Sequence, residues 1–210
     1  IMLSSSIKKY IDYFGVKCGD KISLFTNNDS AYETAVSLSK SGTTVNSIID
    51  IREKSESIIV NQAKNLGIKI YWKHSIVNTQ GYKKINSIDI MKLSDDGTSV
   101  TGNKIKENCD CLGISGGWTP MVHLFTQSGG KLKFNEIDNI FIPDKGSPDQ
   151  ISIGSCNGDF ELYEVIKNSA SSTNKFLNVK NIDYENLEII SSKEMDKKNI
   201  WLLPSDKPLG

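Results

Sequence analysis

The fold class is decided by residues 21–52, KISLFTNNDSAYETAVSLSKSGTTVNSIIDIR. Two short, mostly apolar runs, Lys21–Thr26 and Val45–Ile51, read as buried strands. Between them, Ala31–Lys40 carries apolar residues at helical spacing and is followed by a glycine. This strand, helix, strand order predicts neighbouring parallel strands joined by a crossover helix.

The same alternation continues on both sides. We expect a helix over Leu3–Phe14, a helix over Ser55–Leu66 and a strand over Ile68–Trp72. Ser75–Leu93 then predicts two antiparallel strands around a glycine turn, and Cys109–Ser115 predicts a return to the main sheet. The expected fold is therefore α/β, a Rossmann-like FAD/NAD(P)-binding domain with a parallel sheet and a small antiparallel excursion.

Composition argues against several classes of function. Lys plus Arg and Asp plus Glu both number 25, so no basic excess attracts nucleic acid or an anionic membrane. No apolar run approaches the roughly 18 residues of a membrane span. The four cysteines form no CxxC pair, and the only histidines are His74 and His123. We expect reduced cysteines in a cytoplasmic protein, no metal site and no catalytic residue in this chain.

The turn after the first predicted strand, TNNDSA, is the first candidate site. A dinucleotide-binding turn has the pattern G-x-G-x-x-G or G-x-G-x-x-A, which lets a pyrophosphate approach the N–H groups that begin the helix. Ala31 fits the third position, whereas Thr26 and Asn28 replace glycines. Alternatively Asp29, which would repel a pyrophosphate, or Ser30 only caps the helix. The candidate cofactor-binding residues are Asn27, Asn28, Ser30 and Ala31.

Asp50 and Arg52 form the second candidate. Asp50 ends the second strand about 20 residues after the turn, where an acid can accept a hydrogen bond from the adenosine ribose. Arg52 could stack on adenine or bind a phosphate. The alternative is that Asp50 and Arg52 belong to a solvated strand end.

Two glycine-containing segments complete the list. Gly116-Gly117 follows the last strand of the first domain, where backbone can approach a ligand or simply cross to another domain. Ile151–Phe160 (ISIGSCNGDF) predicts an apolar strand that runs through Gly154, Gly158 and Asp159 into a helix over Glu161–Ser169. Such a junction suits a polar ligand at the helix start.

Several strings resemble a known family. The order of elements, the G-G-W-x-P string and the later glycine-aspartate segment look like flavoproteins of the glutathione reductase type. More narrowly, FTNNDSAY, SGGWTPMVHLFTQSGGKLKF and the tail before Pro208 resemble the alpha subunit of heterotetrameric sarcosine oxidase. The resemblance covers nearly the whole chain, and related amine-oxidising alpha subunits share parts of it.

The resemblance implies a function and a set of partners. Family members oxidise sarcosine to glycine, formaldehyde and hydrogen peroxide, and pass the methylene group to tetrahydrofolate when it is present. It implies partner beta, gamma and delta subunits, with FAD and FMN mainly in beta and at its interface with alpha. The alpha subunit would bind NAD and carry a folate-binding domain.

The resemblance also implies domain limits. We expect an NAD-type domain over residues 1–115, a returning segment of an FAD-type domain over 116–176 and a linker or tail over 177–210. The family's glycine-rich fingerprint would lie upstream and its folate domain downstream, so we expect a fragment that is inactive alone. If that fingerprint holds the NAD, Gly154, Gly158 and Asp159 are the remnant of the site, and the turn from Asn27 to Ala31 is a structural relic.

Two other functions stay open. One is a fragment of a pyridine nucleotide-disulfide oxidoreductase, which a glycine-rich turn and CxxxxC upstream in the parent would favour. The other is a non-catalytic scaffold, whose altered Rossmann turn binds nothing and which only docks other subunits.

Overall fold

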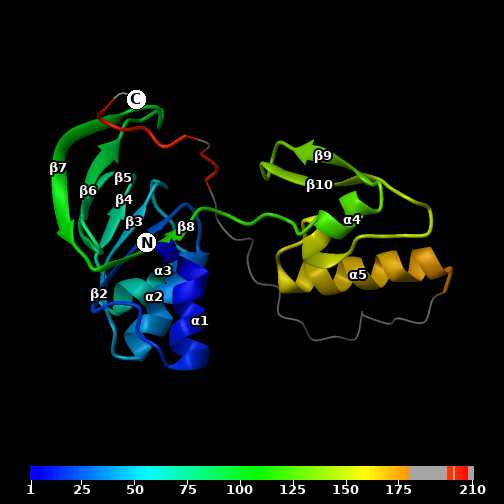
Figure 1. Cartoon of the computed structure of the whole chain (residues 1–210), viewed down its shortest axis with the longest axis horizontal. Coiled ribbons are helices and arrows are strands. Elements are labelled where there is room, and N and C mark those ends of the chain that lie inside the picture. Colours follow the sequence, from blue (N-terminus) through cyan, green and yellow to red (C-terminus); the bar gives the residue numbers. More distant parts are fainter. Residues whose placement is uncertain (180–197, 201, 208–210) are drawn as a thin grey trace. The chain divides into compact units, whose positions relative to one another are not determined.

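The computed structural model describes residues 1–179, 198–200 and 202–207. Two units are distinguished: unit 1 comprises Ile1–Gly117 together with Asp196–Gly210, and unit 2 comprises Trp118–Met195 (Figure 1). Much of the expected tail over 177–210 lies outside the described residues, and the described part from Lys198 onward is grouped with unit 1.

Unit 1 is built on a five-stranded sheet whose paired strands are all parallel. Its strands, in spatial order, are β1 (Met2–Leu3), β8 (Cys111–Ser115), β2 (Lys21–Thr26), β3 (Thr44–Asp50) and β4 (Ile70–Trp72). The prediction of an α/β fold with a parallel sheet is confirmed. For the strands of this sheet that were predicted from the sequence, the observed bounds differ from the predicted bounds by at most two residues at either end.

Three helices, α1 (Ser4–Phe14), α2 (Ser30–Lys40) and α3 (Ile58–Asn65), pack on one face of this sheet (Figure 1). The expected start of α3 at Ser55 is wrong. The helix begins after Ser57, whose hydroxyl accepts a hydrogen bond from the Val60 N–H at 3.4 Å and so caps the helix. Fully buried side chains between the helices and the sheet are Ile7, Leu24, Tyr32, Ile48 and Val60.

The other face of the sheet is covered by the antiparallel excursion, which forms a sheet of its own. Its strands are β5 (His74–Gly81), β6 (Ile85–Leu93) and β7 (Val100–Asn108), with β6 in the middle. Neighbouring residues of β3 pack against different layers, one against the helices and the next against the antiparallel sheet, because successive side chains of a strand point to opposite faces. Ile48 packs with the helices, whereas Ile49 packs with residues of β6 and β8.

Glu107 on β7 ties the antiparallel sheet to the parallel one. Its carboxylate accepts hydrogen bonds from the Lys69 ammonium at 2.7 Å, the Asn46 amide at 2.9 Å and the Tyr71 hydroxyl. Burial raises the pKa of Glu107, but the hydrogen bonds from Lys69, Tyr71 and Asn46 outweigh burial, so the pKa lies below its usual value. The ionised form therefore stabilises the folded state.

We expect Glu107→Gln to make the stability of unit 1 less sensitive to acid. The folded pKa is lowered, so the contribution of Glu107 is complete above its unfolded pKa of about 4.3 and is lost as pH falls through the folded pKa. Urea unfolding between about pH 5 and pH 3 should show a shallower loss of stability in the variant. The exposed Glu53→Gln serves as the control, and equal pH slopes for Glu107→Gln and the unmodified chain would contradict the assignment.

Unit 2 contains a short helix, a hairpin and a long helix. Its elements are α4 (His123–Gln127), β9 (Lys131–Asn135), β10 (Ile140–Lys145), a 3-10 helix at Gly154–Asn157 and α5 (Leu162–Leu177). The strand expected in Ile151–Phe160 is wrong. A strand needs a ladder partner, and in the described part of the chain β9 and β10 pair with each other, while residues 151–153 pair with neither. The helix expected over Glu161–Ser169 is found, but it extends to Leu177.

Candidate functional site

The carboxyl ends of three adjacent strands define the candidate site in unit 1. Thr26 at the end of β2 is in register with Asp50 on β3 and with Ser115 on β8. The chain proceeds from β2 outward to β3 and β4 and only later returns to β8 on the other side of β2. The strand order thus reverses between β2 and β8, and ligands of open α/β sheets bind outside the carboxyl ends of the strands at such a switch point.

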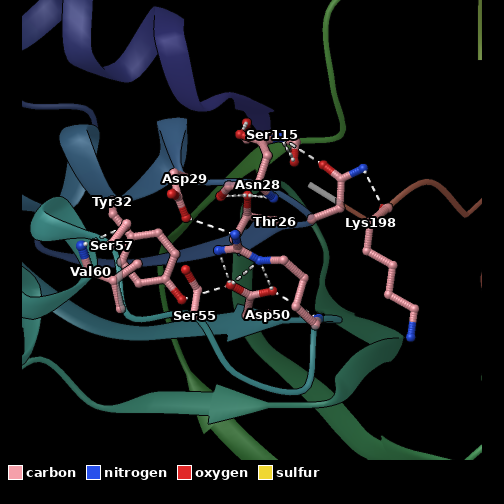
Figure 2. Close-up of polar contacts among 12 residues, drawn as sticks. Thr26, Asn28, Asp29, Tyr32, Asp50, Ser55, Ser57, Val60, Ser115 and Lys198 are labelled. Carbon is pink, nitrogen blue, oxygen red and sulfur yellow. Dashed lines mark hydrogen bonds and ion pairs between the residues drawn. The ribbon is translucent and has the colours of Figure 1, made fainter. Parts of the chain in front are cut away.

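Asn28 supplies the side chain that holds the start of α2. Its carbonyl oxygen accepts hydrogen bonds from the Ser30 N–H at 2.9 Å and the Ser30 hydroxyl at 2.6 Å. The Ser30 hydroxyl also lies 2.8 Å from the Ser115 hydroxyl (Ser115 is labelled in Figure 2). Asp29 occupies the N-cap position, in line with the capping alternative, but its side chain makes no capping hydrogen bond, and the Asn28 side chain accepts the Ser30 N–H instead.

Asp29 and Asp50 converge on one guanidinium. Arg52 donates from Nη1 to Asp29 at 2.7 Å and from Nη2 to Asp50 at 2.8 Å, and its Nε contacts both Asp50 oxygens. Asp29 and Asp50 are labelled in Figure 2. Asp50 and Arg52 are only 0% and 3% exposed, so their alternative description as a solvated strand end is wrong.

Tyr32 closes this cluster from α2. Its hydroxyl donates a hydrogen bond of 2.7 Å to Asp50. Burial and then the charge of Asp50 raise the pKa of Tyr32. Burial lowers the pKa of Arg52, but the hydrogen bonds and charges of Asp50 and Asp29 outweigh burial and raise it overall. The raised pKa values keep the Tyr32 hydroxyl neutral and the Arg52 guanidinium charged, and this cation forms ion pairs with both Asp29 and Asp50.

The hydrogen bonds within this cluster already use the carboxylate oxygens that Asp50 would offer to a ribose. Both of its carboxylate oxygens already accept hydrogen bonds from Arg52, and one also accepts from Tyr32. Sequence reasoning noted that Asp29 would repel a phosphate but did not find its partner. The sequence feature that could have identified this partner was Arg52. It lies two residues beyond the end of β3, at the same edge of the sheet as the turn. The roles of Asp50 and Arg52 in cofactor binding stay predictions.

Asn27 binds the described C-terminal segment. Its backbone oxygen accepts from the Lys198 N–H at 2.9 Å, and its side-chain amide donates to the Lys198 carbonyl at 3.0 Å and to the Gly116 carbonyl at 3.1 Å. Gly116 and Gly117 are exposed and directly follow β8. The structure thus brings together the predicted residues Asn27, Asn28, Ser30 and Gly116. Ala31 lies fully buried in the first turn of α2.

The remaining predicted residues belong to unit 2. Gly154 and Gly158 have φ values of 64° and 95°, in the left-handed region that favours glycine. A Cβ at Gly158 would lie 3.1 Å from Ile142, so packing also restricts this position. One carboxylate oxygen of Asp159 accepts from the Asn168 amide at 3.0 Å. The other is buried without a hydrogen-bond partner among the described residues.

The described ranges of the chain contain no group of three or more His, Cys, Asp or Glu side chains placed to hold a metal ion. None of their helices combines the length and apolar character needed to cross a membrane.

Sequence comparison points to one kind of relative, although no family model matches the chain. The sarcosine oxidase subunit alpha of Corynebacterium sp. (strain U-96) is 27% identical over 207 residues, covering 98% of this chain and 21% of the relative. That of Corynebacterium sp. (strain P-1) is 28% identical over 173 residues, covering 81% and 18%. The chain is a partial homologue of sarcosine oxidase alpha subunits. It spans about a fifth of the length of these curated relatives.

Solved structures show the same fold at low sequence identity. Thioredoxin reductase of T. acidophilum matches with a TM-score of 0.50 and 17% identity, over 74% of this chain and 52% of that one. The HOCl-induced flavoprotein disulfide reductase RclA of Escherichia coli matches with a TM-score of 0.53 and 12% identity, over 77% and 36%. The chain therefore shares an α/β fold with these two reductases.

Proposed function

We propose that the chain is the nucleotide-binding region of a sarcosine oxidase alpha subunit. The observation that carries this proposal is the match to one such subunit along 98% of the chain, which includes both units. The parent complex would oxidise sarcosine to glycine, formaldehyde or methylenetetrahydrofolate, and hydrogen peroxide, in the cytoplasm. FAD, FMN and tetrahydrofolate would lie mostly outside this segment, with the flavins mainly in the beta subunit and at its interface with alpha. The beta, gamma and delta subunits would be the partners.

Within this proposal, NAD binds at the Gly154–Asp159 turn of unit 2 and not at the Asn27–Asp50 turn of unit 1. In unit 1 the acid at the end of β3 is already paired with Arg52, and Asp29 brings a second carboxylate to the place where a pyrophosphate would lie. In unit 2, Asp159 keeps one carboxylate oxygen without a partner among the described residues, so it can accept a hydrogen bond from a ribose hydroxyl.

Calorimetric titration with NAD tests this placement, with NADP and FAD as controls. We expect saturable NAD binding that is about 10- to 100-fold weaker in Asp159→Asn, because a hydrogen bond to a charged acceptor is lost. The matched variant in unit 1, Asp29→Asn, should bind NAD as the unmodified chain does. The reverse order of effects would move the site to unit 1, and the absence of saturable nucleotide binding would contradict the proposal.

One observation favours a second function for unit 1, that of a scaffold that docks other subunits. Because Arg52 forms ion pairs with both acids around the Rossmann turn and Tyr32 donates to Asp50, each of these groups has a partner without a ligand. Stable association with a beta subunit, unchanged by NAD, would favour this function, whereas association that requires NAD would exclude it.

A further inference from the structure

The described C-terminal segment contacts the turn after β2 through the main chain of Lys198. The N–H and the carbonyl of Lys198 both form hydrogen bonds with Asn27, at 2.9 Å and 3.0 Å. Both groups belong to the main chain of Lys198, so this contact does not depend on the Lys198 side chain. Hydrogen bonds to the main chain give affinity for a peptide without selecting its side chains.

The contact lies at the switch point itself. Asn27 directly follows β2, its N–H bonds to the carbonyl of Ser115 at the end of β8, and its side-chain amide reaches the Gly116 carbonyl as well as Lys198. Figure 2 shows Lys198 on the Ser115 side of the cluster that contains Asp29 and Asp50. Lys198 therefore lies at the carboxyl ends of β2 and β8, which is where an α/β sheet of this topology binds its ligand.

A second contact holds the same segment further along the chain. The Lys104 ammonium on β7 lies 2.6 Å from the Asp206 carboxylate, and the two side chains are 39% and 25% exposed. Between these contacts, the described residues run toward β7 in Figure 1. The segment is thus attached at the carboxyl ends of the parallel strands and on the antiparallel sheet.

We infer that the switch point of unit 1, at the carboxyl ends of β2 and β8, is a peptide-binding site, and that residues 198–200 and 202–207 of the same chain occupy it. While the peptide is bound, its backbone forms hydrogen bonds with the backbone oxygen and the side-chain amide of Asn27 at the start of the turn. A dinucleotide pyrophosphate therefore cannot bind at the same position. The Arg52 cluster places paired charges beside the switch point, at the carboxyl end of β3. Unit 1 therefore keeps the fold of a nucleotide-binding domain while it holds a segment of polypeptide.

Residue-resolved amide hydrogen exchange on the whole chain tests this inference. We expect the Lys198 amide to exchange at least about tenfold more slowly than in an unstructured peptide, because its N–H is bonded to Asn27. In Asn27→Ala the side-chain hydrogen bond to Lys198 is lost, and protection should fall about fivefold. Lys17→Ala, which removes an exposed ion pair with Asp20, is the control and should leave Lys198 unchanged.

Exchange of the Lys198 amide at the unstructured rate in the unmodified chain would overturn the inference, whether or not Asn27→Ala folds. Addition of NAD should leave Lys198 protected, and loss of protection on NAD binding would overturn the claim that the peptide excludes a nucleotide. The measurement without NAD does not depend on nucleotide binding, so it stands even if the chain binds no NAD.

Discussion

Replacing Arg52 with methionine is expected to lower the free energy of unfolding of unit 1 by about 3–5 kcal/mol. Methionine keeps the apolar length of the side chain but removes the cation. Asp50, which is fully buried, and Asp29, which is 7% exposed, would then remain as unpaired carboxylates in a poorly solvated place. The loss measures an uncompensated buried charge and not the net value of the ion pairs.

Urea unfolding of unit 1 provides the measurement for Arg52→Met. Lys54→Met is the matched control, because the ion pair of Lys54 with Glu56 is more than 60% exposed on both sides and its loss should change stability by less than about 1 kcal/mol. Arg52→Lys should recover only part of the loss, since one ammonium cannot reproduce the fork that joins two carboxylates. Equal stability of Arg52→Met and Lys54→Met would show that the cluster carries no structural role.

The second large effect is expected at the contact between Leu24 on β2 and Gly113 on β8. Leu24 is fully buried, and a Cβ built on Gly113 would lie 2.6 Å from its Cδ2 atom and 2.8 Å from Cδ1 of Ile7. Leu24→Ala should cost about 2–5 kcal/mol through lost burial and the cavity left behind. Gly113→Ala alone should cost about 1–3 kcal/mol through overpacking.

The double variant distinguishes a packing contact from two independent losses. In Leu24→Ala the space beside Gly113 is vacated, so the added methyl group fills part of the cavity. We expect the cost of the double variant to be at least about 1 kcal/mol less than the sum of the single costs, measured by urea unfolding. Additive costs would mean that Leu24 does not restrict the size of residue 113.

The Arg52 cluster also decides which substitutions can report on nucleotide binding. Asp50→Ala would leave Arg52 without its main partner, so weakened NAD binding in that variant could follow from unfolding alone. Asp159→Asn avoids this difficulty, because it keeps the side-chain volume and the contact with Asn168 can re-form through the amide oxygen.

The local elements of unit 1 could be predicted because their signals are short-range. The apolar run Lys21–Thr26, the helical spacing of Ala31–Lys40 and the second run before Asp50 correspond to β2, α2 and β3. The same reasoning failed at Ile151–Phe160. An apolar run bounded by glycines predicts a strand, but a strand forms only where a partner offers a ladder, and residues 151–153 have none among the described strands.

The candidate site was predictable in its position and not in its contacts. The sequence by itself determined the α/β alternation, the turn at Asn27–Ala31 and the acid at the end of β3, because each depends on neighbours a few residues away. Only the tertiary structure decided that Arg52 joins Asp29 to Asp50 and that Asn27 holds Lys198, 171 residues along the chain. Those pairings arise from the alignment of parallel strand ends at one edge of the sheet, and neither local spacing nor residue type specifies which distant groups meet there.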